Sequence, residues 1–160
     1  MVVIAIGAVL DTQPVSANED SGHHEYPHSH FALFVGAGFE QAKDGHQEEG
    51  SALGLEYEYQ FEEKWGVGVD VERLFGNGTH RSSVAVLPVS YHATENWRLF
   101  AGPGFEFSET GDKFLGRIGV AYELPLRNGW SVSPEILVDF IEDGANTIVI
   151  GIALGRGFDF

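Results

Sequence analysis

Residues 53–71 read LGLEYEYQFEEKWGVGVDV, and on both sides of residues 62–64 every second residue is large and apolar. From Leu53 to Phe61 the apolar residues alternate with Gly, Glu and Gln, and from Trp65 to Val71 they alternate with Gly and Asp. Successive side chains of a β-strand point to opposite faces, so a strict period of two predicts two strands. The polar residues 62–64 predict a turn, and the whole stretch therefore predicts a β-hairpin.

The same hairpin pattern recurs along the chain at a regular spacing. Trp65, Trp97 and Trp130 stand 32 and 33 residues apart, and Phe31 lies 34 residues before Trp65. Each of these aromatic residues begins an alternating segment, and a second alternating segment follows and leads back. Strict alternation over about ten residues matches a strand that crosses a bilayer. Residues 30–160 are therefore predicted to form an eight-stranded antiparallel up-and-down transmembrane β-barrel.

The composition excludes several other classes of protein. The 160 residues are enough for one domain, and they include no cysteine, so neither disulfides nor thiol chemistry is expected. The net charge of −15 opposes contact with phosphates, and nucleic acid is not expected as a partner. The mean hydropathy of −0.07 is that of a soluble protein, but a barrel with a polar interior gives the same average.

The N-terminal residues are expected to lie outside the barrel. Residues 1–17 combine an apolar run with a small-residue sequence ending at Ala17, which is typical of a signal peptide cleaved at that point. No Lys or Arg precedes the apolar run, so we expect the start of this segment to be truncated or misplaced. The alternative is an ordinary first strand, against which Asp11 and Pro14 argue. Residues 18–29 would then form a His-rich tail.

Side-chain size indicates which face of the predicted barrel points outward. One face carries the Trp and Tyr residues and most of the Phe residues, whereas the other carries many Gly residues. An eight-stranded barrel is only just wide enough inside to hold side chains, so the glycine face belongs inside, where it leaves some room. A soluble barrel of lipocalin type, with the aromatic face inside, would be overfilled. The aromatic residues expected to ring one rim at head-group level are Phe31, Trp65, Trp97, Trp130, Phe61, Tyr91, Tyr122 and Phe160.

These patterns resemble a known class of membrane protein. The alternating strands and the final Phe158-Asp159-Phe160 are similar to those of the small OmpA-like and OmpX-like outer-membrane barrels of Gram-negative bacteria. The resemblance implies contact with outer-membrane lipid, and recognition of the C-terminal strand ending at Phe160 by the barrel assembly machinery. We expect a monomer. The resemblance says little of function, because the class includes inert anchors, adhesins, narrow pores and a few lipid-modifying enzymes.

The predicted inward face carries far more acids than bases. Its bases are Arg98 and Arg117, and its acids are Glu40, Glu56, Glu58, Asp70, Glu72, Glu106, Glu123, Glu135 and Asp139. Unpaired carboxylates in a narrow interior must take up protons, bind cations or hold water. One interpretation is a structural charge network of Arg98 and Arg117 with Glu56, Asp70 and Glu135. The other is a cation-selective or proton-conducting path, because rings of Asp and Glu select cations.

A second candidate site lies in the His-rich segment before the barrel. His23, His24, His28 and His30 lie within eight residues. Clustered imidazoles on a flexible chain are typical ligands of zinc or copper, so these four residues are a candidate metal site. The alternative is a solvated leader that binds metal only incidentally. No other cofactor is expected.

An enzyme is a further possibility, because some small barrels act on lipid A. Residues 79–82, Thr-His-Arg-Ser, are similar to the His-x-Ser step of one lipid A deacylase family. Such a triad needs a carboxylate at the same level to orient the histidine, and only Glu72 of the preceding strand is available. The sequence therefore favours a non-enzymatic barrel with a closed or very narrow lumen and a structural or interaction role. The alternative is a binder or conduit for divalent cations.

Overall fold

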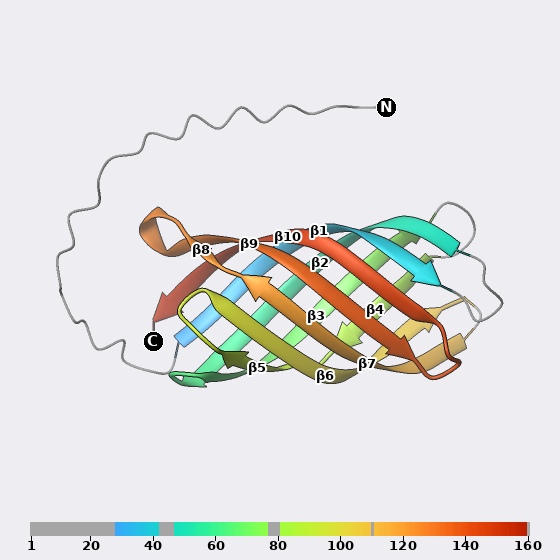
Figure 1. Cartoon of the computed structure of the whole chain (residues 1–160), viewed down its shortest axis with the longest axis horizontal. Coiled ribbons are helices and arrows are strands. Elements are labelled where there is room, and N and C mark those ends of the chain that lie inside the picture. The colour runs from blue at the N-terminus through green and yellow to red at the C-terminus, as the bar shows by residue number, and fades with distance from the viewer. Residues whose placement is uncertain (1–27, 42–46, 77–80, 110, 160) are drawn as a thin grey trace, which may run out of the picture.

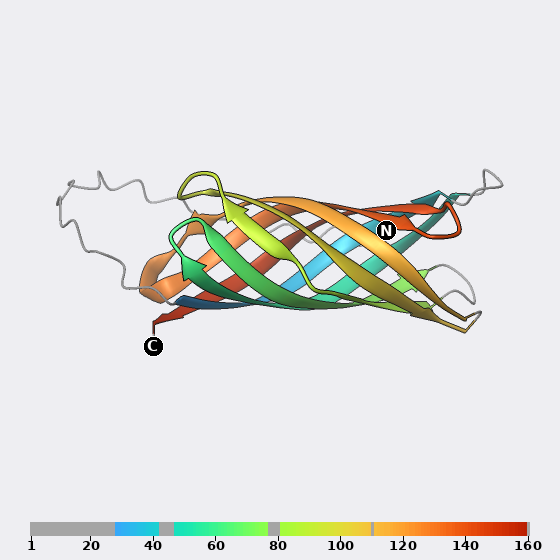
Figure 2. The ribbon, with the colours of Figure 1, turned by 90° about the horizontal axis from the view of Figure 1, so that it is seen from below.

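The computed structural model describes residues 28–41, 47–76, 81–109 and 111–159, which form one closed antiparallel β-barrel (Figures 1 and 2). Its elements are β1 (His28–Gln41), β2 (Gln47–Glu62), β3 (Trp65–Gly76), β4 (Arg81–Val86), β5 (Val89–His92), β6 (Trp97–Ser108), β7 (Gly111–Tyr122), β8 (Leu124–Pro125), the 3-10 turn η1 (Arg127–Gly129), β9 (Trp130–Ile141) and β10 (Asn146–Asp159). None of the described residues forms a helix long and apolar enough to cross a membrane.

The ten strand segments correspond to eight strands around the barrel. β4 and β5 both pair with β3 and β6, so they are two parts of one barrel strand. β7 and β8 share β9 in the same way. The barrel closes where β1 pairs with β10, with His28 opposite Asp159 and Gln41 opposite Asn146. The predicted eight-stranded antiparallel barrel is therefore confirmed.

Trp65, Trp97 and Trp130 are each the first residue of a strand, as the regular spacing predicts. All three lie at the end of the barrel where β1 begins and β10 ends, which we call the base. The opposite end is the loop end. β1 begins at His28, two residues before the expected start of the barrel. The predicted signal peptide and most of the predicted His-rich tail lie outside the described residues, and both stay predictions.

The strands extend further toward the loop end than the sequence suggests. Residues 43–50, 75–82, 108–113 and 141–146 are rich in Gly, Asp, Asn, Ser and Thr, which predicts four outer loops. Residues 47–50 and 111–113 nevertheless belong to β2 and β7. Pairing with a neighbour supplies their backbone hydrogen bonds, and this outweighs their weak strand propensity. The break between β4 and β5, at Leu87 and Pro88, is also not foreseen. Hydrogen bonds from Gly68 N–H to Pro88 O and from Leu87 N–H to Pro103 O bridge it, at 2.8 and 3.0 Å.

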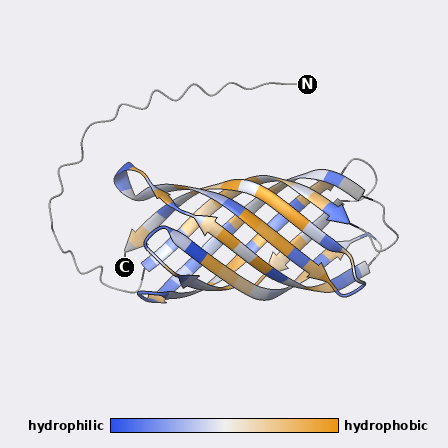
Figure 3. Cartoon of the chain, viewed as in Figure 1, coloured by the Kyte–Doolittle hydropathy of each residue, from blue (hydrophilic) through white to orange (hydrophobic). Residues whose placement is uncertain are grey.

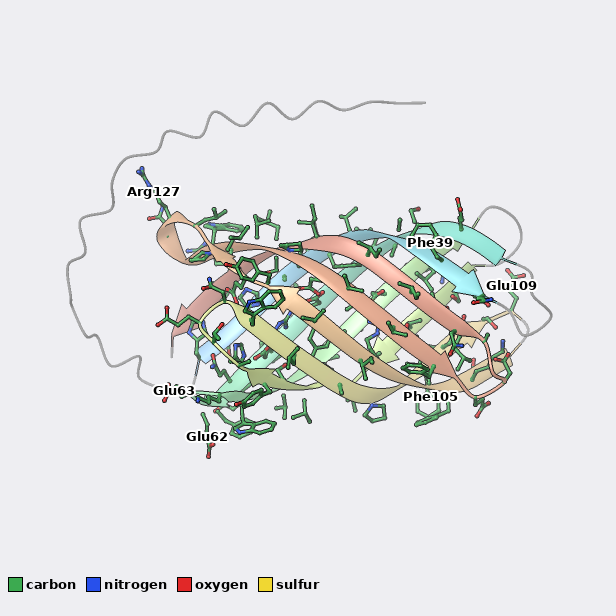
Figure 4. All side chains as sticks on the ribbon, in the orientation of Figure 1. Phe39, Glu62, Glu63, Phe105, Glu109 and Arg127 are labelled. Atoms are coloured by element: carbon green, nitrogen blue, oxygen red, sulfur yellow. The ribbon has the colours of Figure 1, made fainter. Side chains whose placement is uncertain are left out.

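Hydrophobic and hydrophilic residues alternate along the strands (Figure 3), and the large apolar side chains of the described strands are exposed on the outer face. Val35 and Val69, for example, are 55% and 44% exposed, whereas Ala32 and Phe34, on the opposite face of β1, are almost fully buried. Figure 4 shows Phe105 projecting outward from the wall. Side-chain size in the sequence predicts the aromatic face on the outside and the glycine-rich face on the inside. The exposure of the side chains confirms this assignment.

Large side chains of the inward face take up the space above several of its glycines. The ring of Phe34 lies over Gly36 and Gly151, and the ring of Phe100 lies over Gly119. A Cβ atom on Gly36 would come within 2.9 Å of the Phe34 ring. Two buried apolar clusters result. The first contains Ala32, Phe34, Ala52, Phe100, Ala121, Leu137, Val149 and Ala153, and the second contains Val84, Val86, Leu115, Ile141 and Ala145.

Candidate functional site

One group of charged side chains surrounds Arg98, which points inward from β6. Its guanidinium lies 2.9 Å from Glu58, 3.2 Å from Glu56 and 2.9 Å from Glu135. Glu58 and Glu56 come from β2, whereas Glu135 comes from β9 on the other side of the barrel. One guanidinium therefore joins strands that are not neighbours.

The same group extends toward the base through Glu58. Ser90 donates a hydrogen bond to Glu58 Oε2 at 3.1 Å, and His92 Nε2 lies 2.6 Å from Glu58 Oε1. We call Ser90, His92, Arg98, Glu56, Glu58 and Glu135 the Arg98 network. With two hydrogen-bonding partners besides Arg98, the Glu58 carboxylate is well satisfied although it is buried.

A second group surrounds Arg117, which points inward from β7 and is only 2% exposed. Arg117 Nε and Nη2 donate to the two oxygens of Asp139 at 2.6 and 2.7 Å, which is a bidentate pair. Arg117 Nη1 donates to Glu72 of β3. We call Arg117, Glu72 and Asp139 the Arg117 network, and it too ties together strands that are not neighbours.

The structure brings some of the predicted residues together and not others. It places Glu56 and Glu135 against Arg98, but the carboxylates on Arg117 are Glu72 and Asp139. Asp70 is buried on the same inward face, and no hydrogen bond or ion pair joins it to another described residue. Ser90 and His92 also belong to the Arg98 network, and they were not predicted from the sequence as site residues. The one signal for them in the sequence is their inward position in the alternation.

Two buried carboxylate oxygens have no hydrogen-bond partner among the described residues. They are Glu72 Oε2 and Glu135 Oε2, one in each network. Each carboxylate is held by its arginine through the other oxygen only. The inward face therefore carries more acceptor capacity than its two arginines use.

The predicted metal site is only partly visible. His23 and His24 lie outside the described residues, and His28 and His30 belong to β1. His30 Nε2 lies 3.1 Å from Ser131 Oγ, inside the barrel. Across the described ranges, no three His, Asp or Glu residues are arranged to hold a metal ion. Metal binding by the His-rich tail stays a prediction.

The arrangement offers little to the lipid A deacylase alternative. His80 lies outside the described residues. Ser82 is buried and belongs to the inward face of β4, away from lipid. Glu72, the carboxylate proposed to orient the histidine, is already held by Arg117.

An aromatic rim surrounds the base on the outward face. Trp65 lies opposite Tyr91, with ring centres 5.0 Å apart, and Trp97 lies opposite Tyr122, with ring centres 4.9 Å apart. Both pairs are inclined rather than stacked flat, as the charge distribution of aromatic rings favours. Phe160, the last residue expected in this rim, lies outside the described residues.

The fold is that of small membrane barrels of known structure. Neisserial surface protein A superposes with a TM-score of 0.64 and 8% identity, over 82% of this chain and 97% of its own. The attachment invasion locus protein Ail of Yersinia pestis gives 0.59 and 12%, over 84% and 100%. The outer-membrane protein OprG of Pseudomonas aeruginosa gives 0.52 and 13%, over 84% and 97%.

No protein-family signature and no characterised protein sequence matches the chain. At identities of 8 to 13% the likeness concerns the fold alone. The chain has the fold of the small eight-stranded outer-membrane β-barrels, the OmpA-like and OmpX-like class.

Proposed function

We propose that the protein is a non-enzymatic barrel of the Gram-negative outer membrane, whose interior does not conduct and whose role is structural or interactive. The observation that carries this proposal is the filling of the interior. Arg117, Phe34, Leu115 and Leu137 are all among its fully buried large side chains. A path for ions needs a continuous column of water, and the complete burial of side chains of this size supports an interior without such a column.

The chemistry of the interior also supports a structural role. Each arginine is bound by carboxylates from different sides of the barrel, so the networks act as struts across it. Taking a guanidinium out of water is costly unless several acceptors replace the water. Both arginines have such acceptors, and neither is free to bind a passing anion.

The outward surface supports the membrane location. Large apolar side chains are exposed along every barrel strand, including Leu33, Val69, Ile136 and Ile150. Exposing such a large apolar band to water is unfavourable, whereas contact with lipid hydrocarbon is favourable. Outer-membrane lipid is therefore the proposed partner around the wall. We further propose that the barrel is a monomer and that its last strand is read by the assembly machinery.

An interaction role fits the loop end better than the interior. The exposed carboxylates there include Glu49, Glu109, Asp112, Glu142 and Asp143. Two of the similar structures are, by their names, a surface protein and an attachment protein. A partner at the loop end of this chain would have to carry complementary positive charge.

Conductance separates the proposal from the alternative of a cation conduit. Refolded protein in planar bilayers should show no single-channel steps, with or without zinc. Replacing both interior rings, in the double variant Phe34→Ala with Phe100→Ala, should create openings. The matched outward control, Leu33→Ala with Leu99→Ala, should stay silent. Cation-selective steps from the unaltered protein would overturn the closed interior and favour the conduit.

A further inference from the structure

The rim at the base repeats one arrangement twice and then departs from it. Trp65 and Trp97, at the starts of β3 and β6, each face a tyrosine of the neighbouring strand. Trp130, at the start of β9, instead faces Arg156 of β10. The Arg156 guanidinium carbon lies 5.7 Å from the centre of the Trp130 ring and 5.3 Å from that of Phe158. A cation therefore replaces the expected tyrosine.

Arg156 has no anionic partner among the described residues. Its side chain is exposed on the outward face and lies over the rings of Trp130 and Phe158. Across the closing pair, its register partner on β1 is Phe31. Cation–π contacts orient a guanidinium over the ring faces but leave its N–H donors unused. The edge of this guanidinium is thus presented to whatever surrounds the barrel.

The turn before β9 brings a second cation to the same side of the base. Trp130 N–H donates to the Arg127 carbonyl, and Leu126 N–H donates to the Trp130 carbonyl at 2.7 Å. Gly129, at φ +73°, lets the turn lie against the end of β10, where a Cβ would meet Gly157 O at 3.4 Å. Figure 4 shows Arg127 standing clear of the barrel, at the same end as Glu62 and Glu63.

We propose that Arg156, supported by Trp130 and by the charge of Arg127, binds the phosphate of an anionic phospholipid in the leaflet at the base. The inference rests on the proposed membrane location. A guanidinium donates in a bidentate manner to phosphate oxygens, and an indole N–H at head-group level is a further donor. The chain as a whole is charged −15 and repels anionic lipid, so any preference for such lipid requires a local site.

A second outward cation provides a control. Arg73 of β3 is also exposed, but it donates to Ser83 Oγ at 2.7 Å, so one donor is already used. Among the described residues, the guanidiniums that lie over aromatic rings are those of Arg98 and Arg156, and not that of Arg73. It lies nearer the loop end, four residues beyond Val69. If charge alone attracted lipid, Arg73 and Arg156 would contribute alike. The proposed site predicts that they differ.

The test is native mass spectrometry of the folded full chain with phosphatidylglycerol and with phosphatidylcholine of the same acyl chains. The unaltered protein should bind phosphatidylglycerol about fivefold more tightly, as expected for one cation at the membrane surface. Arg156→Tyr, which reproduces the other two rim pairs, should lose this preference. Arg73→Gln should keep it, and Arg156→Lys should retain part of it.

Two outcomes would overturn the site: an unchanged preference in Arg156→Tyr, or an equal loss in Arg73→Gln and Arg156→Tyr. Heat-modifiable gel migration of each variant checks that the barrel has folded. A chain that folds without lipid or detergent would instead refute the proposed membrane location, so the two failures are distinguishable.

Discussion

Arg117 and Arg156 are the same side chain on opposite faces of one barrel wall. Arg117 is buried inside and is bound by the carboxylates of Asp139 and Glu72, whereas Arg156 is exposed outside and touches aromatic rings. Arg117 contacts Asp139, its register partner on the adjacent strand β9, and also Glu72 of β3, which is not a neighbouring strand. Arg156 contacts Trp130, its register partner on β9, and Phe158 of its own strand. The difference shows that the face of a strand, which alternates with every residue, determines how a charge can be accommodated.

The largest effect is expected inside, from Arg117→Met. The substitution leaves the carboxylates of Glu72 and Asp139 buried without their cation, which should lower the free energy of unfolding by about 3 to 5 kcal/mol. Urea unfolding in lipid vesicles, followed by tryptophan fluorescence, measures it. Removing the acids as well, with Glu72→Met and Asp139→Leu, should restore most of the loss. Wild-type stability in the single variant would contradict this account of the network.

A new charge in the middle of the outward face should cost somewhat less. Val69→Arg places a cation against the lipid hydrocarbon, with an expected loss of about 2 to 4 kcal/mol. The control Ser51→Arg lies on the same face near the loop end and should cost only about 0 to 1 kcal/mol. The same unfolding measurement applies. Equal losses at both positions would mean that depth in the membrane does not matter, against the assigned orientation.

Removing the natural outer arginine should have a small effect on stability. In Arg156→Leu the cation–π contacts with Trp130 and Phe158 are lost. Because Arg156 lies close to the membrane surface, its charge costs little desolvation, and removing that charge therefore gains little free energy. We expect a change of less than about 1 kcal/mol in the free energy of unfolding. A loss as large as that of Arg117→Met would remove the contrast between the two faces.

The smallest effect concerns an exposed ion pair at the loop end. Lys113 Nζ lies 2.7 Å from Asp143 Oδ2, and its hydrogen bond lowers the pKa of Asp143 below the ordinary value. A lowered folded pKa stabilises the barrel above the unfolded pKa of about 3.9, and the contribution disappears as pH falls through the folded value. Because both groups are partly exposed, it should not exceed about 0.5 kcal/mol. The free energy of unfolding is measured between pH 5 and pH 2 for the unaltered protein and for Lys113→Met. The ion pair should appear as a steeper fall of this free energy with decreasing pH in the unaltered protein.

The outer surface was predictable from the sequence because it obeys a local rule. A lipid-facing residue is followed by an inward one, so period two and the three tryptophans identify the strands and their outward residues. The barrel interior obeys no such rule. Phe34 and Phe100 share the inward alternation with Gly36 and Gly102, and the sequence gives no sign that their rings cover neighbouring glycines.

The pairing of charges was also beyond local reasoning. Glu56, Asp70 and Glu135 were all expected around the arginines, but which acid meets which base depends on the stagger of strands far apart in the chain. Arg98 reaches Glu56 and Glu135 from positions 42 and 37 residues away. The residues next to Arg98 in the sequence do not indicate such a contact. The contact between Trp130 and Arg156, in contrast, follows directly once the strand register is known.

The pairing of β1 with β10 along their whole length makes the first described strand depend on the last. During synthesis β1 is made long before its partner, so its outer hydrogen-bonding edge stays open until β10 is in place. A chain cut before Asn146 would keep two unpaired edges, on β1 and on β9, and each is a template for a strand of another molecule. Loss of the final strand would therefore make the chain prone to aggregation, even if all the other strand pairings formed.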